Sequence, residues 1–367
     1  MDQRVQKMAE ILIHHSARIA PGDRVLLEGT TAAEPLIKAL YEGVLKAGGH
    51  PYPFLSFPEQ IRSHFIHSSD EQLDHENLIR KYAYEKFESR IRIHSLTNTT
   101  QLNDISPDRQ MILRKAQSGI LKTQMKRGAA DELKWVTTLY PTAAYAAEAG
   151  MTLEEFEDFV FSACLADQEN PIALWEQVKE DQQAGLELFQ GHETVQLSGP
   201  NIDLELSIKD RIFNNCYGTH NIPDGEIYTG PVEKSVNGWV KYSYPAILDG
   251  VVVRGVELVF KDGKVIEASA EEQEEFLMSM LETDPGARYL GEFAVGTNQN
   301  IQQFTGNILF DEKIGGTIHM ALGAGYPETG SKNTSAIHWD MICDMRKDSE
   351  IKVDGEIVYQ DGKFIYS

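Results

Sequence analysis

The 367-residue chain carries 56 acidic against 34 basic residues, which gives a formal net charge of −22 at pH 7. Such a surface repels phosphate backbones and anionic lipids, so the composition argues against a nucleic-acid or membrane partner, although acidic surfaces most often serve solubility alone. The length allows two domains, each with its own core. No apolar run reaches the roughly 18 residues of a transmembrane helix.

The N-terminus and the cysteines indicate the compartment. The first twenty residues lack the long apolar stretch and the cleavage site of a signal peptide. Cys164, Cys216 and Cys343 are widely separated, so they predict neither a disulfide framework nor a CxxC metal motif. We therefore expect a cytoplasmic protein.

The first half of the chain alternates helical and strand-like segments. An amphipathic helix with Val5, Met8, Leu12 and Ile19 near helical spacing opens it. In chain order we then predict a strand at 24–28, a helix at 33–47 closed by glycines, a strand at 52–55, a helix at 69–90, a strand at 91–96, a helix at 105–120, a strand at 135–140, and helices at 152–166 and 171–188. The β–α–β order predicts right-handed crossovers and a parallel sheet.

From about residue 190 onward, strand patterns dominate. They recur at 194–199, 202–208, 239–246, 250–260 and 264–270, and two turn-linked strands close the chain over 350–367. We therefore predict an α/β N-terminal domain with a mostly parallel, Rossmann-like sheet over 1–190, and a β-rich α+β C-terminal domain over 191–367.

The parallel-sheet half does not carry a nucleotide-binding fingerprint. No GxGxxG stands between a strand and a helix in it. The pair Gly323 and Gly325 is followed by Tyr-Pro-Glu, which favours a turn over the start of a helix. The sequence therefore gives little support to nucleotide binding.

Histidines and carboxylates gather in the C-terminal part. His338 and Asp340 form an H-x-D pair, and in an extended strand both side chains project to the same face. Such a pair can offer an imidazole and a carboxylate to one ion, or Asp340 can simply orient His338 or cap a turn. The sequence alone leaves both interpretations open.

Two glutamates extend this set. Glu226 follows the turn in Asn-Ile-Pro-Asp-Gly-Glu, and Glu292 stands beside a glycine at the edge of an apolar run. Either glutamate alone is typical of a solvated turn. Together with the histidines they make a mixed ligand set that suits zinc, cobalt or manganese, and two such ions would need bridging carboxylates.

These segments resemble the aminopeptidase T/aminopeptidase S family of metallo-aminopeptidases, often called thermophilic metalloproteases. The resemblance covers nearly the whole chain and rests on the segments 21–29, 138–167, 221–238, 290–298, 309–330 and 333–344. It implies a peptide substrate with a free N-terminus, a catalytic C-terminal domain, an N-terminal domain that shapes the cleft, and a homodimer.

The resemblance also implies residue roles. A pair of divalent ions (zinc, cobalt, manganese or magnesium) would be bound by Glu226, Glu292, His319, His338 and Asp340. Glu312 would be the general base and Tyr326 would stabilise the transition state. Some relatives have Asp-Glu-Asn-Ala with the histidine nearer, whereas here a longer loop separates Glu312 from His319. Asp311 and Glu328 therefore stay open as alternative bases.

Two other functions compete with this one. A different metal-dependent amide or ester hydrolase would use the same ions, and a non-enzymatic metal- or ligand-binding protein would keep the scaffold without turnover. The complete ligand set argues against the second, because a degenerate site usually loses a member. Cys343 follows the apolar residues Met341 and Ile342, so it is predicted to be a buried core cysteine rather than a nucleophile.

Overall fold

The computed structural model describes residues 2–366, which divide into two compact units. The first comprises residues 2–175 together with Gly218–Pro223, and the second comprises Glu176–Tyr217 together with residues 224–366. Helix α9 (Pro171–Glu187) runs from the first unit into the second, so the change from helices to strands near residue 190 falls inside the second unit. Among the residues described, no helix combines the length and the apolar character that crossing a membrane requires.

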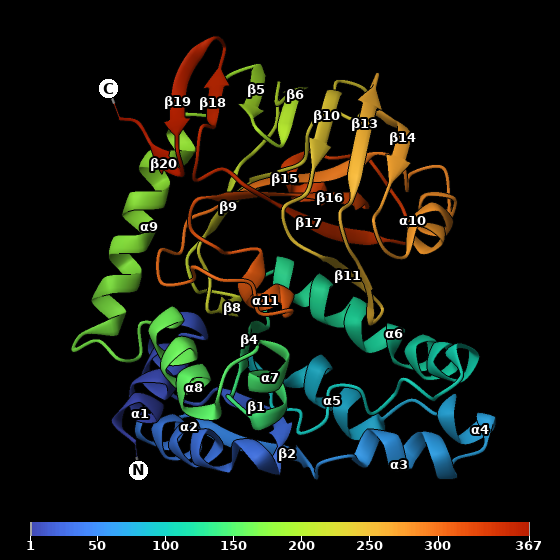
Figure 1. The fold of residues 1–367 in the computed structure, drawn as a ribbon. Helices are drawn as coiled ribbons and strands as arrows, with labels where there is room; N and C mark the ends of the chain where they lie inside the picture. The colour runs from blue at the N-terminus through green and yellow to red at the C-terminus, as the bar shows by residue number, and fades with distance from the viewer. Residues whose placement is uncertain (1, 367) are drawn as a thin grey trace. The chain divides into compact units, whose positions relative to one another are not determined.

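The first unit is built on a parallel sheet in the order β2-β1-β3-β4-β8 (Figure 1). Its strands are β1 (Arg24–Thr30), β2 (His50–Ser56), β3 (Ser89–His94), β4 (Lys134–Leu139) and β8 (Asn221–Ile222). Its helices are α1 (Gln3–Glu10), α2 (Glu34–Lys46), α3 (Gln60–His67), α4 (Asp70–Leu73), α5 (Leu78–Lys86), α6 (Pro107–Ala129), α7 (Ala143–Glu148) and α8 (Leu153–Ala163). All its strand pairs are parallel, which confirms the predicted α/β sheet.

Side-chain caps begin several helices of this unit, and one of them, at Asn77, falls inside a predicted helix. The helix predicted over 69–90 is wrong as one piece, because Ser69 caps α4 and Asn77 caps a separate α5. The opening α-helix also stops early, at Glu10, and continues as a π-helix over Ile11–Ser16. The predicted capping box is confirmed, because Thr152 and Glu155 satisfy each other's backbone N–H groups.

The second unit holds two larger sheets. One has the order β14-β13-β10-β6-β5-β18-β19-β20, from β5 (Thr194–Gly199), β6 (Ile202–Ser207), β10 (Asn237–Lys241), β13 (Glu257–Lys261), β14 (Lys264–Ser269), β18 (Glu350–Val353), β19 (Glu356–Gln360) and β20 (Lys363–Phe364). The other has the order β17-β16-β15-β9-β7, from β7 (Asn214–Cys216), β9 (Glu226–Thr229), β15 (Leu290–Gly296), β16 (Thr317–Gly323) and β17 (His338–Asp344). A small ribbon of β11 (Ala246–Leu248) and β12 (Val251–Val253) and two helices, α10 (Glu274–Leu281) and α11 (Ile308–Asp311), complete it.

Asp-Gly turns close several hairpins of this unit. Asp262 and Gly263 join β13 to β14 with φ values of 49° and 82°, and Asp354-Gly355 does the same between β18 and β19. A two-residue turn whose central residues both have positive φ matches the twist of the flanking strands, and Asp-Gly accepts that conformation at low cost. The turn residues therefore set the register of these strands.

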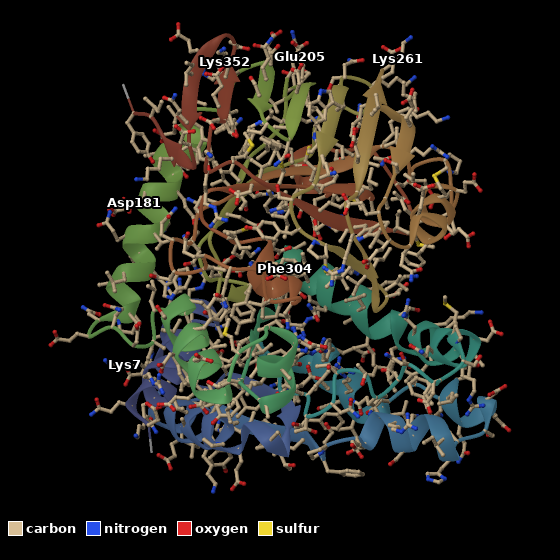
Figure 2. All side chains as sticks on the ribbon, viewed as in Figure 1. Lys7, Asp181, Glu205, Lys261, Phe304 and Lys352 are labelled. Atoms are coloured by element: carbon tan, nitrogen blue, oxygen red, sulfur yellow. The ribbon has the colours of Figure 1, made fainter. Side chains whose placement is uncertain are left out.

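The two larger sheets pack on a shared apolar core. In β6, Leu204 and Leu206 are buried in that core while Glu205, marked in Figure 2, is exposed. The second sheet contributes Phe293, Met320 and further apolar side chains to the same core. Strands alternate their side chains between faces, so the opposite face of the second sheet is left for polar residues. The β-rich α+β fold predicted for this part of the chain is confirmed.

Candidate metal centre

The polar face of the sheet β17-β16-β15-β9 carries the predicted ligands. Residues directly opposite each other on paired strands lie on the same face. Each ligand then has a glycine or an alanine beside it: Glu226 pairs with Gly296, Glu292 with Ala321, His319 with Ala294, Asp340 with Ala321 and His338 with Gly323. On one side of each ligand the neighbouring strand therefore adds little side-chain bulk.

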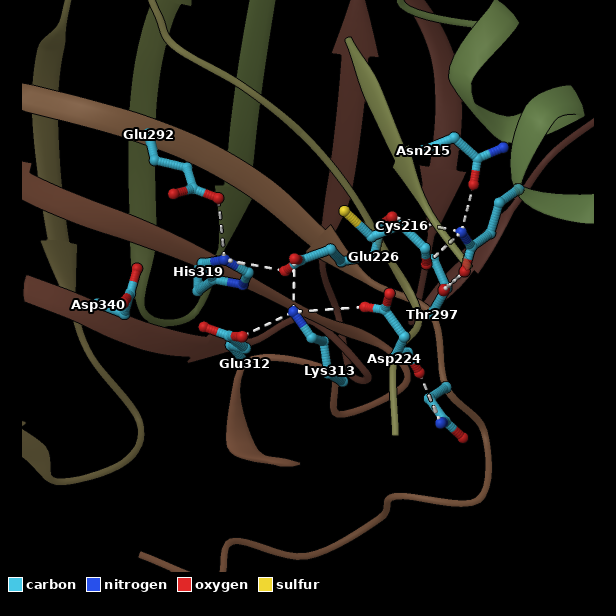
Figure 3. Close-up of polar contacts among 12 residues, drawn as sticks. Asn215, Cys216, Asp224, Glu226, Glu292, Thr297, Glu312, Lys313, His319 and Asp340 are labelled. Carbon is cyan, nitrogen blue, oxygen red and sulfur yellow. Dashed lines mark hydrogen bonds and ion pairs between the residues drawn. The ribbon is translucent and has the colours of Figure 1, made fainter. Parts of the chain in front are cut away.

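Glu292 stands at the centre of a histidine–carboxylate group. Its Oε1 lies 3.5 Å from Nε2 of His319, and its Oε2 lies 3.2 Å from Nε2 of His338. Asp340 Oδ1 lies 3.4 Å from the same nitrogen of His338. Ligand atoms of Glu292, His319 and Asp340 all fall within 4.8 Å of one another. Figure 3 shows these three side chains converging.

The backbone fixes the orientation of His338. Its Nδ1 lies 2.8 Å from the carbonyl oxygen of Ala324, and because a carbonyl only accepts, Nδ1 carries the proton. In the neutral imidazole the lone pair is then on Nε2, which faces Glu292 and Asp340. An outer hydrogen bond that sets the tautomer in this way is typical of a metal-binding histidine.

Several buried polar atoms at this group have no hydrogen-bond partner, and they show whether a metal ion would fit there. Within residues 2–366, the buried atoms that lack a hydrogen bond include both ring nitrogens of His319, Oε2 of Glu226 and Oδ1 of Asp340. A buried polar group without a partner is costly, and two of these atoms, Nε2 of His319 and Oε2 of Glu226, lie only 3.3 Å apart. Imidazole nitrogens and carboxylate oxygens are the donors that zinc and its neighbours prefer. The group of Glu292, His319, His338 and Asp340 therefore fits a divalent cation.

A second group adjoins the first and contains a lysine. The ammonium of Lys313 lies 2.5 Å from Glu226 Oε1, 2.6 Å from Glu312 Oε1 and 3.6 Å from Asp224 Oδ1. Figure 3 shows the three carboxylates around it. Glu226 also approaches the first group, because its Oε2 lies 3.3 Å from Nε2 of His319. The two groups thus share Glu226.

Burial and the neighbouring charges shift the pKa values at this centre in opposite directions. Burial raises the pKa of Glu226 to about 8, although Lys313 opposes the rise. Burial also acts on Glu292, but the imidazoles of His319 and His338 outweigh it and lower the pKa of that carboxyl to about 2. Against burial, Glu292 and Glu226 raise the pKa of His319 to about 9, and Asp340 and Glu292 raise that of His338 to about 12. The centre therefore favours positive charge between its carboxylates.

The three candidate bases differ in their surroundings. Glu312 follows α11 and forms a group with Glu226 and His319, in which all ligand atoms lie within 4.8 Å of one another. Burial raises its pKa. Asp311 instead accepts hydrogen bonds from the backbone N–H and hydroxyl of Thr305, at 2.7 and 2.8 Å. Glu328 is exposed on the surface. The longer loop thus leaves Glu312 beside His319.

Tyr326 lies at the edge of the histidine–carboxylate group. Its ring packs edge-on against His338 at a centroid distance of 5.2 Å and lies 5.3 Å from the ring of Tyr228. Burial and the nearby carboxylates Glu292 and Asp340 raise its pKa, so the phenol keeps its proton. It can donate a hydrogen bond toward the ligands. The structure therefore brings all seven predicted site residues into one region of the second unit.

Sequence reasoning missed several residues of this region. Lys313 was passed over although it directly follows Glu312, and Asp224 although it stands two residues before Glu226. Cys216 pairs with Glu226 across β7 and β9, and its ligand atoms group with those of Asp224 and Glu226. Gln182 of α9 donates to the carbonyl oxygens of Cys216 and Glu226, at 2.9 and 3.3 Å. The only sequence signal for Asp224 was its place in the turn just before Glu226, and none was present for Gln182.

Comparisons with known proteins identify a family and a shared fold. The profile described as thermophilic metalloprotease (M29) matches residues 1–364. Aminopeptidase 2 of Geobacillus stearothermophilus is 27% identical over 99% of this chain and 95% of its own length, and aminopeptidase T of Thermus thermophilus is 26% identical over 98% and 96%. The solved structure of wild-type AmpT from Thermus thermophilus shares the fold, with a TM-score of 0.85 at 22% identity over 99% of each chain. A 2,5-dihydroxypyridine dioxygenase from Pseudomonas putida KT2440 has a similar fold at a TM-score of 0.59 and 15% identity, over 100% of this chain and 97% of its own.

Proposed function

The chain belongs to the thermophilic metalloprotease family, M29, and from this premise we propose that it is a metal-dependent aminopeptidase that removes the N-terminal residue from peptides. The observation that carries the proposal is the convergence of Glu292, His319, His338 and Asp340, in which Nε2 of His319 and Oδ1 of Asp340 are buried without a hydrogen bond. The relatives named aminopeptidases cover nearly the whole chain and support the same activity.

The proposed roles follow from where each side chain lies. A divalent ion bound by this group supplies a Lewis acid that polarises the peptide carbonyl and makes water more acidic. Glu312, beside His319, accepts the proton of the attacking water and returns it to the leaving amine. Tyr326, which keeps its proton, donates a hydrogen bond to the oxygen that becomes negative.

Recognition of a free amine is the property that separates this activity from other hydrolyses. The carboxylates of the centre outnumber its basic side chains and attract a protonated α-amino group. We propose that this attraction places the N-terminal residue, and no later one, at the ion. A general amide or ester hydrolase with the same ion would not need to bind a free α-amino group.

The test compares aminoacyl-nitroanilides with their N-acetylated counterparts, on the metal-loaded chain and on the chain treated with a chelator. We expect release of nitroaniline from the free-amine substrates alone, and only with metal. Equal cleavage of the acetylated substrates would point to another amide hydrolase. No cleavage by a loaded chain of any substrate in a broad amino-acid panel would favour a binding protein.

Other features of the expected enzyme stay predictions. We propose a homodimer in the cytoplasm, with a peptide substrate and with no nucleic-acid or membrane partner. Zinc, cobalt, manganese and magnesium all remain candidates, because mixed histidine–carboxylate sites accept several metals. The division of roles at about residue 190, with the N-terminal part shaping the cleft, is likewise a proposal.

A further inference from the structure

Tyr326 is carried by the loop of residues 324–337, which joins β16 to β17 and which we call the Tyr326 loop. Three glycines, Gly323, Gly325 and Gly330, lie in it or directly before it, so its backbone has little stiffness of its own. The proposed hydrogen bond from the phenol requires a fixed ring, because a displacement of about 1 Å can cost ~10²-fold in rate. Contacts with the rest of the second unit therefore have to hold the loop.

The two ends of the Tyr326 loop are tied together where it leaves and rejoins the sheet. The N–H of Ala324 donates to the carbonyl oxygen of Ile337 at 2.7 Å, and the side-chain amide of Asn333 donates to the carbonyl oxygen of Gly323 at 2.6 Å. These bonds fix the carbonyl of Ala324, whose oxygen lies 2.8 Å from Nδ1 of His338. This part of the loop thus orients a predicted metal ligand.

The turn that begins at Tyr326 is closed by the hydroxyl of Thr329. This threonine has 0% exposure, and its hydroxyl donates to the carbonyl oxygen of Tyr326 at 2.7 Å. Its N–H donates to the same oxygen at 3.0 Å. The hydroxyl oxygen in turn accepts from the N–H of Ser331 at 3.3 Å. One buried side chain therefore connects the backbone at Tyr326 with the return of the loop at Ser331.

The closed turn is also fastened to neighbouring segments. The N–H of Ile212 donates to the carbonyl oxygen of Thr329 at 3.0 Å. The N–H of Lys332 donates to Oε1 of Glu233 at 2.7 Å, and the other oxygen of Glu233 accepts from Arg211 at 2.8 Å. These bonds reach the loop on both sides of the turn.

Gly230, directly after β9, lies against the same turn. A Cβ at this position would stand 2.9 Å from the hydroxyl oxygen of Thr329 and 2.6 Å from Cβ of Ser331, both too close for a side chain. The turn therefore has no room to shift toward β9, and its position depends on how Thr329 closes it.

We propose that Thr329 is a positioning residue for Tyr326, whose hydroxyl fixes the backbone at Tyr326 and thereby the place of the phenol beside His338. The inference rests on the proposed function for the role of the phenol, but not for the anchoring of the loop. Tyr326 is proposed to donate to an oxygen that becomes negative only in the transition state, so loss of the anchor lowers kcat and leaves KM nearly unchanged. The metal content stays the same, because the bonds that orient His338 are not touched.

Thr329→Val tests this inference, because valine has the shape of threonine without the hydroxyl. For a free-amine nitroanilide we expect kcat to fall about 10-fold while KM changes by less than roughly 2-fold. Thr329→Ser, which keeps the hydroxyl, should retain most of the wild-type kcat. Thr142→Val is the matched control, because the hydroxyl of Thr142 donates to the backbone carbonyl of Leu96 in the first unit. Its kcat per folded molecule should equal that of the wild type.

The same substitution in a Tyr326→Phe background separates positioning from a general structural role. Tyr326→Phe alone should lower kcat by about 10²-fold. Thr329→Val should then lower kcat little further, because its effect passes through the phenol. Equal fold-losses in the two backgrounds, or wild-type kcat in a folded Thr329→Val, would overturn the inference.

Hydrogen exchange at the backbone N–H of Ile212 gives a readout that does not depend on catalysis. This N–H is bonded to the carbonyl of Thr329, so it should exchange faster in Thr329→Val than in the wild type, Thr329→Ser or Thr142→Val. Mass spectrometry of the segment that contains Ile212 measures the rate, and an unchanged rate in Thr329→Val would overturn the anchoring.

Gly230→Ala provides a second variant, which displaces the turn from the side of β9. It should reproduce both the loss of kcat and the faster exchange, and it decides the question if Thr329→Val does not fold. Wild-type kcat and exchange in Gly230→Ala would then overturn the inference. If the wild-type chain cleaves no nitroanilide, the proposed function fails, and the exchange rates alone decide whether Thr329 anchors the loop.

Discussion

Each unit of this protein buries a cluster of charges, and the two clusters are opposite in design. In the first unit the carboxylate of Glu28 forms ion pairs with Arg80 at 2.7 Å, Arg90 at 2.9 Å and Arg92 at 3.2 Å. The hydroxyl of Tyr84 also donates a hydrogen bond to it, at 2.8 Å. One anion is thus surrounded by cations. In the second unit the ammonium of Lys313 is surrounded by anions.

The two clusters differ in how many of their polar atoms lack a hydrogen-bond partner. Both oxygens of Glu28 are engaged. One nitrogen each of Arg80 and Arg90 lacks a hydrogen bond, but within residues 2–366 no group of possible metal ligands includes Glu28. Next to Lys313, in contrast, His319 has two ring nitrogens without hydrogen bonds, and Asp340 and Glu226 each have such an oxygen. Burial and charge are common to both clusters. Only convergent, unsatisfied donors distinguish a binding site from a structural ion cluster.

The largest expected effect is on catalysis, from Glu312→Gln. Glutamine fills the same space and still accepts from Lys313, but it cannot take up a proton. Turnover of a free-amine nitroanilide should fall by about 10³-fold or more, roughly 4 kcal/mol in the barrier. The metal content and the thermal stability should stay close to those of the wild type, because no ligand of the first group is removed.

Steady-state kinetics together with metal analysis of the same sample checks this prediction. A Glu312→Gln enzyme that retains its turnover would remove Glu312 from the role of base. Loss of turnover in Glu328→Gln instead would move that role to the exposed glutamate. Loss of metal from Glu312→Gln would show that this carboxylate is a ligand rather than a base.

Glu28→Gln should produce the complementary result in the first unit. It leaves buried guanidinium groups without their counter-charge, and breaking a buried ion cluster by removing one partner costs about 3–5 kcal/mol of unfolding free energy. We expect a lower midpoint in thermal and urea unfolding, with unchanged metal content and unchanged turnover per folded molecule. Glu34→Gln, at the exposed pair with Lys38, is the matched control and should change stability by roughly 0.5 kcal/mol or less. If Glu28→Gln and Glu34→Gln were equally stable, the Glu28 cluster would not be a stabilising ion cluster, and its contrast with the Lys313 cluster would not hold.

The alternation of residues made much of the second sheet predictable. His338 and Asp340 were expected on one face of a strand, and they do lie together on β17, because a period of two is a local property of extended backbone. The ligands on the other strands came from the resemblance to the family. Sequence spacing could not show that Glu226 and His319 are close, because their strands, β9 and β16, both pair with β15 and not with each other.

What the sequence did not reveal depends on contacts between distant segments. Lys313 reaches its carboxylates because Asn298 holds the loop that carries it, and neither residue type indicates this. Glu28 meets arginines more than fifty residues away on β3 and α5, and no local pattern marks that cluster. The break between α4 and α5 was missed because it is decided by side-chain caps, which outweigh the continuous polar composition of the segment.

The smallest expected effect is the pH dependence of the Glu28 cluster. Burial alone would raise the pKa of Glu28, but Arg92, Arg80 and Arg90 together lower it from 4.5 to about 2. Because the folded pKa lies below the unfolded one, the carboxylate stabilises the fold fully above the unfolded pKa and progressively less as pH falls toward the folded value.

The stability difference between the wild type and Glu28→Gln should therefore be about 3 kcal/mol near neutral pH and about half of that at roughly pH 3. Urea unfolding of both proteins between pH 7 and pH 3 measures this difference, and subtracting one protein from the other removes the titration of groups that they share. A constant difference across this range would show that Glu28 contributes through packing rather than charge. The difference should narrow only as the carboxylate of Glu28 becomes protonated, because its three arginines stay charged throughout.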